Sequence, residues 1–278
     1  MSSIDDSDLE HISRIIHDDA GIVIDAGKNY LVQDRLESVA RNVGLDSVKS
    51  LVRELRGPRG RALRESVVDA MTTNETFFFR DEVPFRTLGE QVLPWLARTR
   101  ASQKRISLWC AAASTGQEPY SLAMTFLESA CGATGWNLDQ LATDISTTAL
   151  ERARIGRYTD FEVGRGLDEA RRARYFERDG RFWVARPELK RLVDFKRFNL
   201  LHAQSQEGPF DLIFVRNVLI YFDVPTKAKI LRAMSRALAP DGLLVLGAGE
   251  SILQLDVNLV RVATLPGAYY ARPGHPLA

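Results

Sequence analysis

The stretch from Ile106 to Leu122 constrains the fold of this chain most, because it reads as a strand, a tight turn and a helix in direct succession. An apolar run short enough for a buried strand leads through small residues to Gly116, and Pro119 suits the first turn of a helix. In a parallel α/β sheet such a turn lies at the carboxyl ends of the strands, where backbone N–H groups can meet the polar part of a cofactor. An ordinary strand-to-helix connection without a ligand is the alternative for this turn taken alone.

Composition and charge bound the class of protein. With 278 residues, 45% of them apolar and 26% charged, we expect one large domain or a large domain with a smaller one. The net charge of +1 gives no overall preference for an anionic or a cationic partner. Cys110 and Cys131 form neither a disulfide framework nor a zinc-binding pattern. Because no apolar run reaches membrane-spanning length and the N-terminus is acidic, we expect a cytoplasmic protein without membrane insertion.

The region from Ser7 to about Asn74 has helical periodicity throughout. Its apolar residues recur in four stripes, which predicts four helices. The stripes are Leu9, Ile12, Ile15 and Ile16; Leu31, Leu36, Val39 and Val43; Val48, Leu51, Val52 and Leu55; and Leu63, Val67, Val68 and Met71. Gly44 predicts the C-terminus of the second helix.

Part of this helical region is basic. Between residues 34 and 64, eight basic side chains stand against four acidic ones, a local excess of four positive charges. The basic residues are Arg35, Arg41, Lys49, Arg53, Arg56, Arg59, Arg61 and Arg64. Solvated charge on helix surfaces is one explanation, and a docking face for an acidic partner is the other.

Three consecutive phenylalanines, Phe77 to Phe79, predict a core or a seam between two domains. Asn74, Thr76 and Arg80 lie among these apolar residues, and polar groups must find partners where they are buried. Because a domain seam is a favoured place for a ligand, these three side chains are candidate binding residues.

From about Glu82 onward, helices and strands alternate as in an α/β sheet. The expected elements are a helix at 82–100, strands at 106–111 and 136–142, strands at 193–197, 210–215 and 243–246, a helix at 225–238, and an antiparallel pair at 259–263 and 268–272. Residues 157–192 break this rhythm with a helix and a hairpin at Asp179-Gly180. Asp144 follows the second strand, where an acid can accept hydrogen bonds from ribose hydroxyls, although a turn role is equally consistent. Ser146 can cap the next helix.

The small-residue turn favours one class of adenosine cofactor. A dinucleotide fingerprint needs Gly-x-Gly-x-x-Gly, whereas the residues from Cys110 to Gly116 include three alanines, which leave less room for a pyrophosphate. S-adenosylmethionine has no pyrophosphate and therefore fits this turn better.

Four segments together resemble the CheR family, the bacterial chemotaxis receptor glutamate methyltransferases. They are Asn74-x-Thr76-x-x-x-Arg80, residues 112–121, Ala142-Thr143-Asp144-Ile145 and residues 216–222, in the family's order and over nearly the whole chain. The resemblance implies a Rossmann-like class I S-adenosylmethionine-dependent methyltransferase domain of the α/β class at 81–278, with a small inserted β-subdomain at about 157–192. It further implies an all-α N-terminal receptor-docking domain and linker at 1–80.

The resemblance also implies the site residues. S-adenosylmethionine would be held by Asn74, Thr76, Arg80, Glu118, Asp144, Asn199, Leu200, Arg216 and Asn217, with Arg80 and Tyr221 nearest to methyl transfer. The acceptor would be a receptor glutamate, which is ionised at neutral pH and needs no general base. The product would be S-adenosylhomocysteine, and no metal is expected.

The partner implied by the family is the helical bundle of chemoreceptors, with acidic methylation helices. We expect Arg35, Arg41, Arg53 and their neighbours to attract that surface, and we expect no nucleic acid partner. Some family members grip a receptor C-terminal peptide with a longer, glycine-rich hairpin loop. Because the turn between Phe176 and Phe182 is short here, we expect no such tethering.

Two other interpretations remain open at this point. One is a methyltransferase for nucleic acid or a small molecule, but there is no Asn/Asp-Pro-Pro-Tyr segment after the fourth strand and no concentrated basic-aromatic surface. The other is a cofactor-sensing or scaffold protein without turnover, which the presence of both Arg80 and Tyr221 disfavours.

Overall fold

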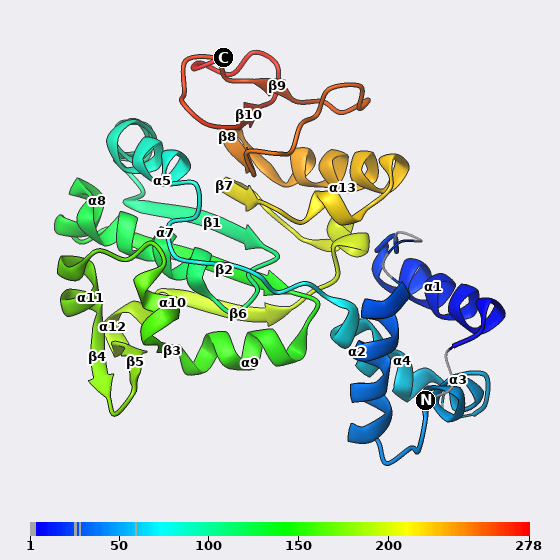
Figure 1. Cartoon of the computed structure of the whole chain (residues 1–278). Coiled ribbons are helices and arrows are strands. Elements are labelled where there is room, and N and C mark those ends of the chain that lie inside the picture. Colours follow the sequence, from blue (N-terminus) through cyan, green and yellow to red (C-terminus); the bar gives the residue numbers. More distant parts are fainter. Residues whose placement is uncertain (1–3, 25–26, 28, 59) are drawn as a thin grey trace. The chain divides into compact units, whose positions relative to one another are not determined.

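The computed structural model describes residues 4–24, 27, 29–58 and 60–278, and Figure 1 follows the chain through its helices and strands. The helices are α1 (Asp6–Ala20), α2 (Asn29–Asn42), α3 (Val48–Leu55), α4 (Gly60–Met71), α5 (Val83–Thr87), η2 (Leu88–Val92), α6 (Leu93–Thr99), α7 (Gln117–Glu128), α8 (Ala130–Ala133), α9 (Thr147–Ile155), α10 (Asp160–Gly164), α11 (Glu169–Tyr175), α12 (Pro187–Lys190), η3 (Leu200–Ser205), η4 (Leu219–Tyr221) and α13 (Val224–Ala237). The strands are β1 (Arg105–Ala111), β2 (Asn137–Asp144), β3 (Arg157–Thr159), β4 (Phe176–Asp179), β5 (Phe182–Ala185), β6 (Val193–Arg197), β7 (Phe210–Val215), β8 (Leu238–Leu246), β9 (Val260–Arg261) and β10 (Tyr269–Ala271).

A seven-stranded sheet of order β6-β2-β1-β7-β8-β10-β9 carries the α/β part of the chain. The first five strands of this order run parallel, and β10 pairs antiparallel with β8 and with β9. The predicted parallel sheet with a terminal antiparallel pair is therefore confirmed. The strand order reverses between β1 and β7, and ligands of such sheets bind outside the carboxyl ends of the strands at this point.

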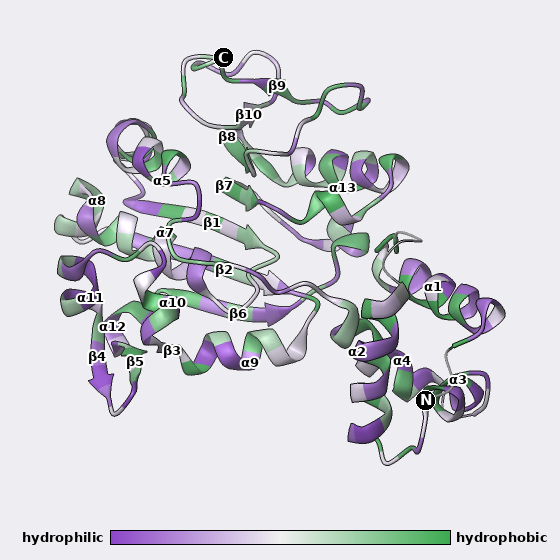
Figure 2. Ribbon diagram, viewed as in Figure 1, coloured by the Kyte–Doolittle hydropathy of each residue, from purple (hydrophilic) through white to green (hydrophobic). Residues whose placement is uncertain are grey.

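The core of this sheet is apolar. Every residue of β7 is buried, and Figure 2 shows this strand in the hydrophobic colour. Trp109 of β1 is fully buried, and its indole N–H donates to the Thr143 hydroxyl 2.9 Å away, so that its polar atom is satisfied. Burial of aliphatic and aromatic side chains at about 25 cal/mol per Å² is the main stabilising contribution to such a sheet.

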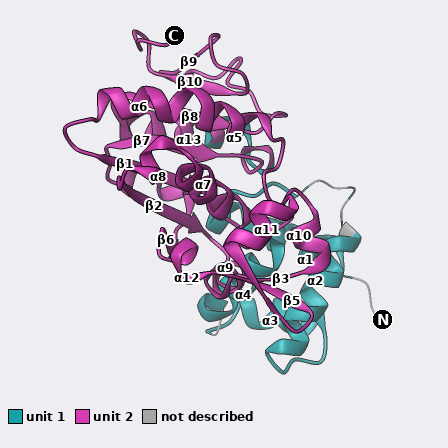
Figure 3. Cartoon of the chain, turned by 90° about the vertical axis from the view of Figure 1, so that its left-hand side faces the viewer, with its two compact units in different colours: residues 1–73, 221–226 teal, residues 74–220, 227–278 magenta. Residues whose placement is uncertain are grey.

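The chain divides into two compact units (Figure 3). The helical unit comprises the residues up to Thr73 together with Tyr221–Thr226, and the α/β unit comprises Asn74–Ile220 and Lys227–Ala278. A short segment after β7 thus belongs to the helical unit although it lies far along the chain from α1–α4. Within the helical unit, Ile22 forms an antiparallel bridge with Phe222, and the Val23 N–H donates to the Tyr221 carbonyl at 2.9 Å.

The four predicted helices of the helical unit are confirmed. Gly44 has φ of 76° after α2, with its N–H on the Arg41 carbonyl and the Leu45 N–H on the Ala40 carbonyl, which is the hydrogen-bond pattern of a Schellman C-cap. The predicted stripe on α2 was partly wrong. Leu31 and Val43 are exposed, because the buried face follows the 3.6-residue repeat through the other apolar positions. Those positions are Val32, Leu36, Val39 and Ala40.

The inserted β-subdomain is a three-stranded antiparallel sheet of order β3-β5-β4. The predicted hairpin turn is present, with Gly180 at φ of 56°. Strand β3 was missed, because its three residues are too few for a periodicity signal.

Two element boundaries differ from the prediction. Pro240-Asp241-Gly242 was expected to separate a helix from a strand, but β8 runs through it with a register shift opposite β7, where Phe210 pairs with Leu238 and Leu212 with Leu243. The expected helix at 82–100 contains a π-helical turn, in which the Leu93 N–H reaches the Leu88 carbonyl. In the part of the chain that the structure describes, no helix has the length and apolar character needed to cross a membrane.

Candidate functional site

The turn after β1 has the small residues because its backbone and its neighbours leave no room for larger ones. Ala112, Ser114 and Gly116 have φ of 62°, 51° and 97°, in the left-handed region. A Cβ on Gly116 would lie 2.9 Å from the Cβ of Ala153 and 3.0 Å from the Tyr158 hydroxyl. The sequence-predicted strand, turn and helix are thus present, and the turn is tightly packed from behind.

Asp144 connects this turn to the end of β2. One carboxylate oxygen accepts from the Ser114 N–H at 2.8 Å and the other from the Ser146 N–H at 2.9 Å. The Ser114 hydroxyl in turn donates to the Asn74 carbonyl at 2.9 Å. The Asp144 carboxylate therefore holds this turn, and the structure brings Asp144 and Asn74 to the same turn.

A buried arginine lies at the end of β7. The Arg216 side chain is fully buried; one Nη lies 2.5 Å from a Glu118 oxygen, and the other lies 2.9 Å from Asp81 and 2.8 Å from the Arg80 carbonyl. Its Nε is buried, with no hydrogen-bond partner among the described residues. A buried charge needs paired carboxylates, so Glu118, Asp81 and Arg216 form one unit. Asp81 was missed from the sequence, where an acid next to Arg80 carries no signal of its own.

The Cys110 thiol contacts the same carboxylate. It donates to the second oxygen of Glu118 at 3.4 Å. Burial raises the pKa of the Cys110 thiol well above its usual value, and the Glu118 charge raises the pKa further. The thiol is therefore a neutral hydrogen-bond donor, and both oxygens of Glu118 have a partner.

Arg80 contributes its backbone, not its side chain, to this charged unit. Its guanidinium is half-buried, donates to the Glu75 carbonyl at 3.2 Å and lies 5.5 Å from the centre of the Phe77 ring. Among the residues that the structure describes, the Arg80 side chain forms no ion pair. Phe78 and Phe79 are buried core residues, as predicted, and Thr76 lies half-buried between them and Asn74.

Asn199 and Leu200 lie just beyond β6. The Asn199 side chain accepts from the Leu201 N–H at 3.0 Å and begins η3, and Leu200 is buried. The Phe198 N–H donates to the Asp144 carbonyl at 2.8 Å, so the ends of β6 and β2 are held together. Asn199 and Leu200 therefore belong to the same edge of the sheet as Asp144.

Asn217 and Tyr221 lie on the segment that follows β7. Asn217 has φ of 57°, and Tyr221 is the last residue of η4 and belongs to the helical unit. The predicted cofactor residues thus fall into two groups in the α/β unit, one around Asp144 and one around Arg216. Tyr221 is described with the helical unit.

The basic residues of the helical unit differ in their contacts. Arg35 donates to the Met71 and Thr72 carbonyls, Arg56 pairs with Asp8 at 3.0 Å, and Arg64 pairs with Asp19 at 3.1 Å. These three arginines hold helices of the unit together. Four other basic residues are exposed, and of these Arg41 contacts only the Ser38 hydroxyl and, at 4.0 Å, Glu37 of its own helix; the four are Arg41, Lys49, Arg53 and Arg61. Arg59 lies outside the described residues.

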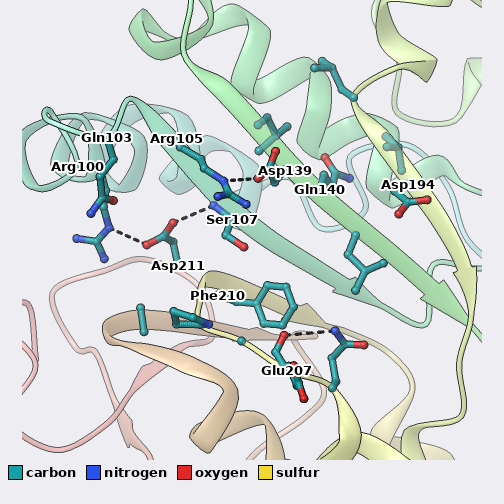
Figure 4. A pocket seen from close by; sticks show the side chains of 18 of the residues that line it. Arg100, Gln103, Arg105, Ser107, Asp139, Gln140, Asp194, Glu207, Phe210 and Asp211 are labelled. Atoms are coloured by element: carbon teal, nitrogen blue, oxygen red, sulfur yellow. Dashed lines mark hydrogen bonds and ion pairs between the residues drawn. The ribbon is translucent and has the colours of Figure 1, made fainter.

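A cleft of about 1420 Å³ lies at the opposite, amino-terminal edge of the sheet (Figure 4). Arg100 pairs there with Asp211, whose other oxygen accepts the Ser107 N–H at 2.8 Å, and Arg105 pairs with Asp139. The charges of these two pairs neutralise one another, and the Gln140 side-chain oxygen, which also lines the cleft, is buried without a hydrogen-bond partner among the described residues. Among the described residues, no group of three or more His, Cys, Asp and Glu side chains is placed to hold a metal ion.

Comparison with known proteins gives two family matches. The family model for the CheR methyltransferase SAM binding domain matches residues 74–264, and that for the CheR methyltransferase all-alpha domain matches residues 7–72. The chain is 43% identical over 272 residues to a chemotaxis protein methyltransferase of Vibrio parahaemolyticus, which covers 96% of this chain and 98% of that protein. It is 40% identical over 268 residues to chemotaxis protein methyltransferase 1 of Pseudomonas aeruginosa, covering 95% of this chain and 97% of that protein.

Proposed function

Since this chain belongs to the CheR methyltransferase family and is an S-adenosylmethionine-dependent methyltransferase, we propose that it methylates the γ-carboxylate of specific chemoreceptor glutamates. The products are glutamate methyl esters and S-adenosylhomocysteine, and the reaction serves adaptation in bacterial chemotaxis. The observation that carries the proposal is the buried Arg216–Glu118 pair at the carboxyl edge of the sheet. The chain's similarity to chemotaxis protein methyltransferases supports the same proposal. The acceptor lies in the cytoplasmic helical bundle of the receptor.

The residues at this edge fit an adenosine cofactor with an amino acid end. The buried Arg216 Nε lacks a hydrogen-bond partner among the described residues, and the turn at Gly116 is fixed in place by close packing against Ala153 and Tyr158. We assign cofactor binding to Asn74, Thr76, Arg80, Glu118, Asp144, Asn199, Leu200, Arg216 and Asn217. Carboxylates such as Glu118 and Asp144 suit an amine and ribose hydroxyls. When bound, the cofactor supplies an electrophilic methyl group on a sulfonium.

The chain itself has to bring the acceptor into line and exclude water. A glutamate with a pKa of about 4.3 is already ionised at neutral pH, so no proton has to be removed. Proximity and orientation then supply most of the rate. The Arg80 guanidinium has no carboxylate partner among the described residues, which supports its role in fixing an anionic group. Tyr221 orients the attacking oxygen.

The exposed basic residues support docking of the acidic methylation helices. Lys49 and Arg53 lie one turn apart on α3 and are both exposed, so they present two positive charges on one helix face. Arg41 and Arg61 extend this set, whereas Arg35 is occupied by backbone carbonyls. The β-subdomain has a short hairpin turn, and we propose that docking proceeds without a receptor C-terminal pentapeptide.

The decisive experiment follows isotope-labelled methyl from S-adenosylmethionine into receptor-containing membranes. Mild alkali releases volatile methanol from a carboxyl methyl ester but not from methylated nitrogen or a nucleobase. We expect volatile label that disappears with Arg80→Ala and persists with Arg105→Ala, which changes an exposed arginine at the other edge. Label that stays bound to protein or nucleic acid after alkali would point to another acceptor.

Docking is tested separately by charge reversal. We expect Lys49→Glu with Arg53→Glu to raise the KM for receptor about tenfold and to leave the cofactor Kd unchanged, because electrostatic steering acts on the partner. Arg14→Glu on α1 is the matched control. Unchanged kinetics in the double variant would remove α3 from the docking surface, and saturable binding of a receptor-tail pentapeptide would overturn the tether-free proposal.

A further inference from the structure

The segment after β7 is held by the carboxylate of Glu250, a residue that no sequence motif singled out. Glu250 lies in the loop after β8 and is 8% exposed. One of its oxygens accepts the N–H groups of Asn217 at 2.7 Å and Gly247 at 2.8 Å. The other accepts the N–H groups of Val218 at 3.0 Å and Leu219 at 2.7 Å. Four backbone donors thus converge on a single side chain.

This convergence is not a salt bridge. Among the described residues, no Lys, Arg or His side chain pairs with Glu250, and its charge is stabilised by backbone N–H dipoles. Three of these N–H groups belong to Asn217, Val218 and Leu219, the two residues before η4 and its first residue, where a helix leaves its first donors without partners. The carboxylate therefore fixes the direction in which this turn leaves the sheet.

The same carboxylate sets the position of the Asn217 side chain. Asn217 has φ of 57°, a conformation that costs free energy for a residue with a Cβ, and its N–H bond to Glu250 helps to hold it there. A Cβ on Gly247 would lie 2.8 Å from the Asn217 side-chain nitrogen and 2.8 Å from the Glu250 oxygen. The absence of a side chain at Gly247 is what lets the amide and the carboxylate approach.

We infer that Glu250 is a positioning residue for methyl transfer. It holds Asn217, which we assign to the cofactor, and Leu219, the first residue of the short helix η4 that ends at Tyr221. One buried carboxylate thereby orders the backbone of three consecutive residues, from Asn217 to Leu219. The inference rests on the proposed function for the roles of Asn217 and Tyr221, but the four hydrogen bonds do not.

The test is Glu250→Gln, which keeps the size of the side chain but replaces one acceptor oxygen with a donor. Two of the four N–H groups then lose their partner. We expect the variant to remain folded, with kcat/KM for receptor lowered about 100-fold, because small misplacements of reacting groups have effects of this size. The cofactor Kd, measured by calorimetry with S-adenosylhomocysteine, should rise at the same time.

Asp211→Asn is the matched control, since Asp211 is an equally buried acid that accepts a backbone N–H at the other edge of the sheet. We expect it to lower the midpoint of thermal unfolding and to leave kcat and the cofactor Kd within about twofold. If Glu250→Gln lowers the unfolding midpoint in the same way and leaves both kinetic and binding constants unchanged, Glu250 is structural only and the inference is wrong.

Gly247→Ala provides a second variant in case Glu250→Gln does not fold. Its methyl group would collide with both the Asn217 amide and the Glu250 oxygen while the carboxylate itself is retained, so we expect weaker cofactor binding in a folded protein. Unchanged cofactor affinity in that variant would contradict the inference. Failure of the proposed acceptor would look different, because wild-type enzyme would then form no alkali-labile methyl while Glu250→Gln would still weaken cofactor binding.

Discussion

Arg100 and Arg216 are two arginines of similar chemistry at opposite edges of one sheet. Arg100 uses Nε and both Nη atoms on Asp211 and Asp241, at 2.5 to 2.9 Å, so every nitrogen is satisfied. Arg216 pairs with Glu118 and Asp81, but its buried Nε has no partner among the described residues. Arg100, Asp211 and Asp241 therefore form a closed ion-pair network, called here the amino-edge clamp, in which every arginine nitrogen has a partner. Arg216 at the carboxyl edge keeps one N–H donor without a partner, and such a donor is available to a binding site.

Left-handed backbone at non-glycine residues is more frequent at the carboxyl edge than at the amino edge. At the carboxyl edge it occurs at Ala112, Ser114 and Asn217, whereas at the amino edge it occurs at Lys104, before β1. Strained conformations of non-glycine residues persist where surrounding hydrogen bonds hold them, and they are concentrated near functional sites. Here the Asp144 and Glu250 carboxylates provide those bonds.

The largest effect is expected for Arg216→Met. It leaves the Glu118 charge buried without its partner, which costs about 3 to 5 kcal/mol in the free energy of unfolding. Cofactor affinity should fall by about 100-fold or more, because a buried charged donor is lost. Chemical denaturation and calorimetry measure the two effects. Adding Glu118→Gln to Arg216→Met should recover the free energy of unfolding but not the cofactor affinity. Recovery of both would show that Arg216 is structural, like Arg100.

Arg100→Met should separate stability from function. We expect a loss of about 2 kcal/mol in the free energy of unfolding, since two carboxylates lose their shared partner at a site with 13% of the arginine side chain exposed. Cofactor Kd should stay within about twofold of the wild type. A large rise in that Kd would show that the amino edge is not merely structural.

The clamp also predicts a pH dependence of stability. The hydrogen bond from Arg100 holds the pKa of the Asp241 carboxyl below its ordinary value, so the folded pKa is lower than the unfolded one. Its stabilising contribution is complete above the unfolded pKa of about 3.9 and is lost as the pH falls through the folded pKa. Urea unfolding between pH 6 and pH 3 should therefore show a steeper loss of stability in wild type than in Asp241→Asn. If the free energy of unfolding falls equally with pH in wild type and in Asp241→Asn, the ion pair between Arg100 and Asp241 does not stabilise the fold.

The smallest effect is expected for Arg105→Ala at the mouth of the amino-edge cleft. Arg105 and Asp139 are 62% and 46% exposed, and such surface pairs contribute about 0.5 kcal/mol or less. We expect unchanged activity, and a change in unfolding free energy that shrinks further in high salt. A loss above about 1 kcal/mol would indicate that the cleft is more tightly coupled to the core than its exposure suggests.

Local patterns predicted much of this architecture. The strand, turn and helix around Gly116, the Ser146 cap and the terminal antiparallel pair are present, and the predicted family is confirmed by the comparisons. The prediction was wrong for Pro240–Gly242, because these residues form an irregular stretch inside β8, whose Leu238 and Leu243 on either side pair with Phe210 and Leu212 of β7.

What the sequence determined by itself is what short-range chemistry encodes: periodicity selects helices and strands, and glycine and small residues select turns. What only the tertiary structure decided is which polar groups meet. Glu250 lies more than thirty positions from three of the four N–H groups it binds, and Asp81 and Glu118 reach Arg216 only because β7 is placed next to β1. Pairings between residues far apart in the chain depend on burial and strand order, and the spacing of nearby residues in the sequence does not encode either.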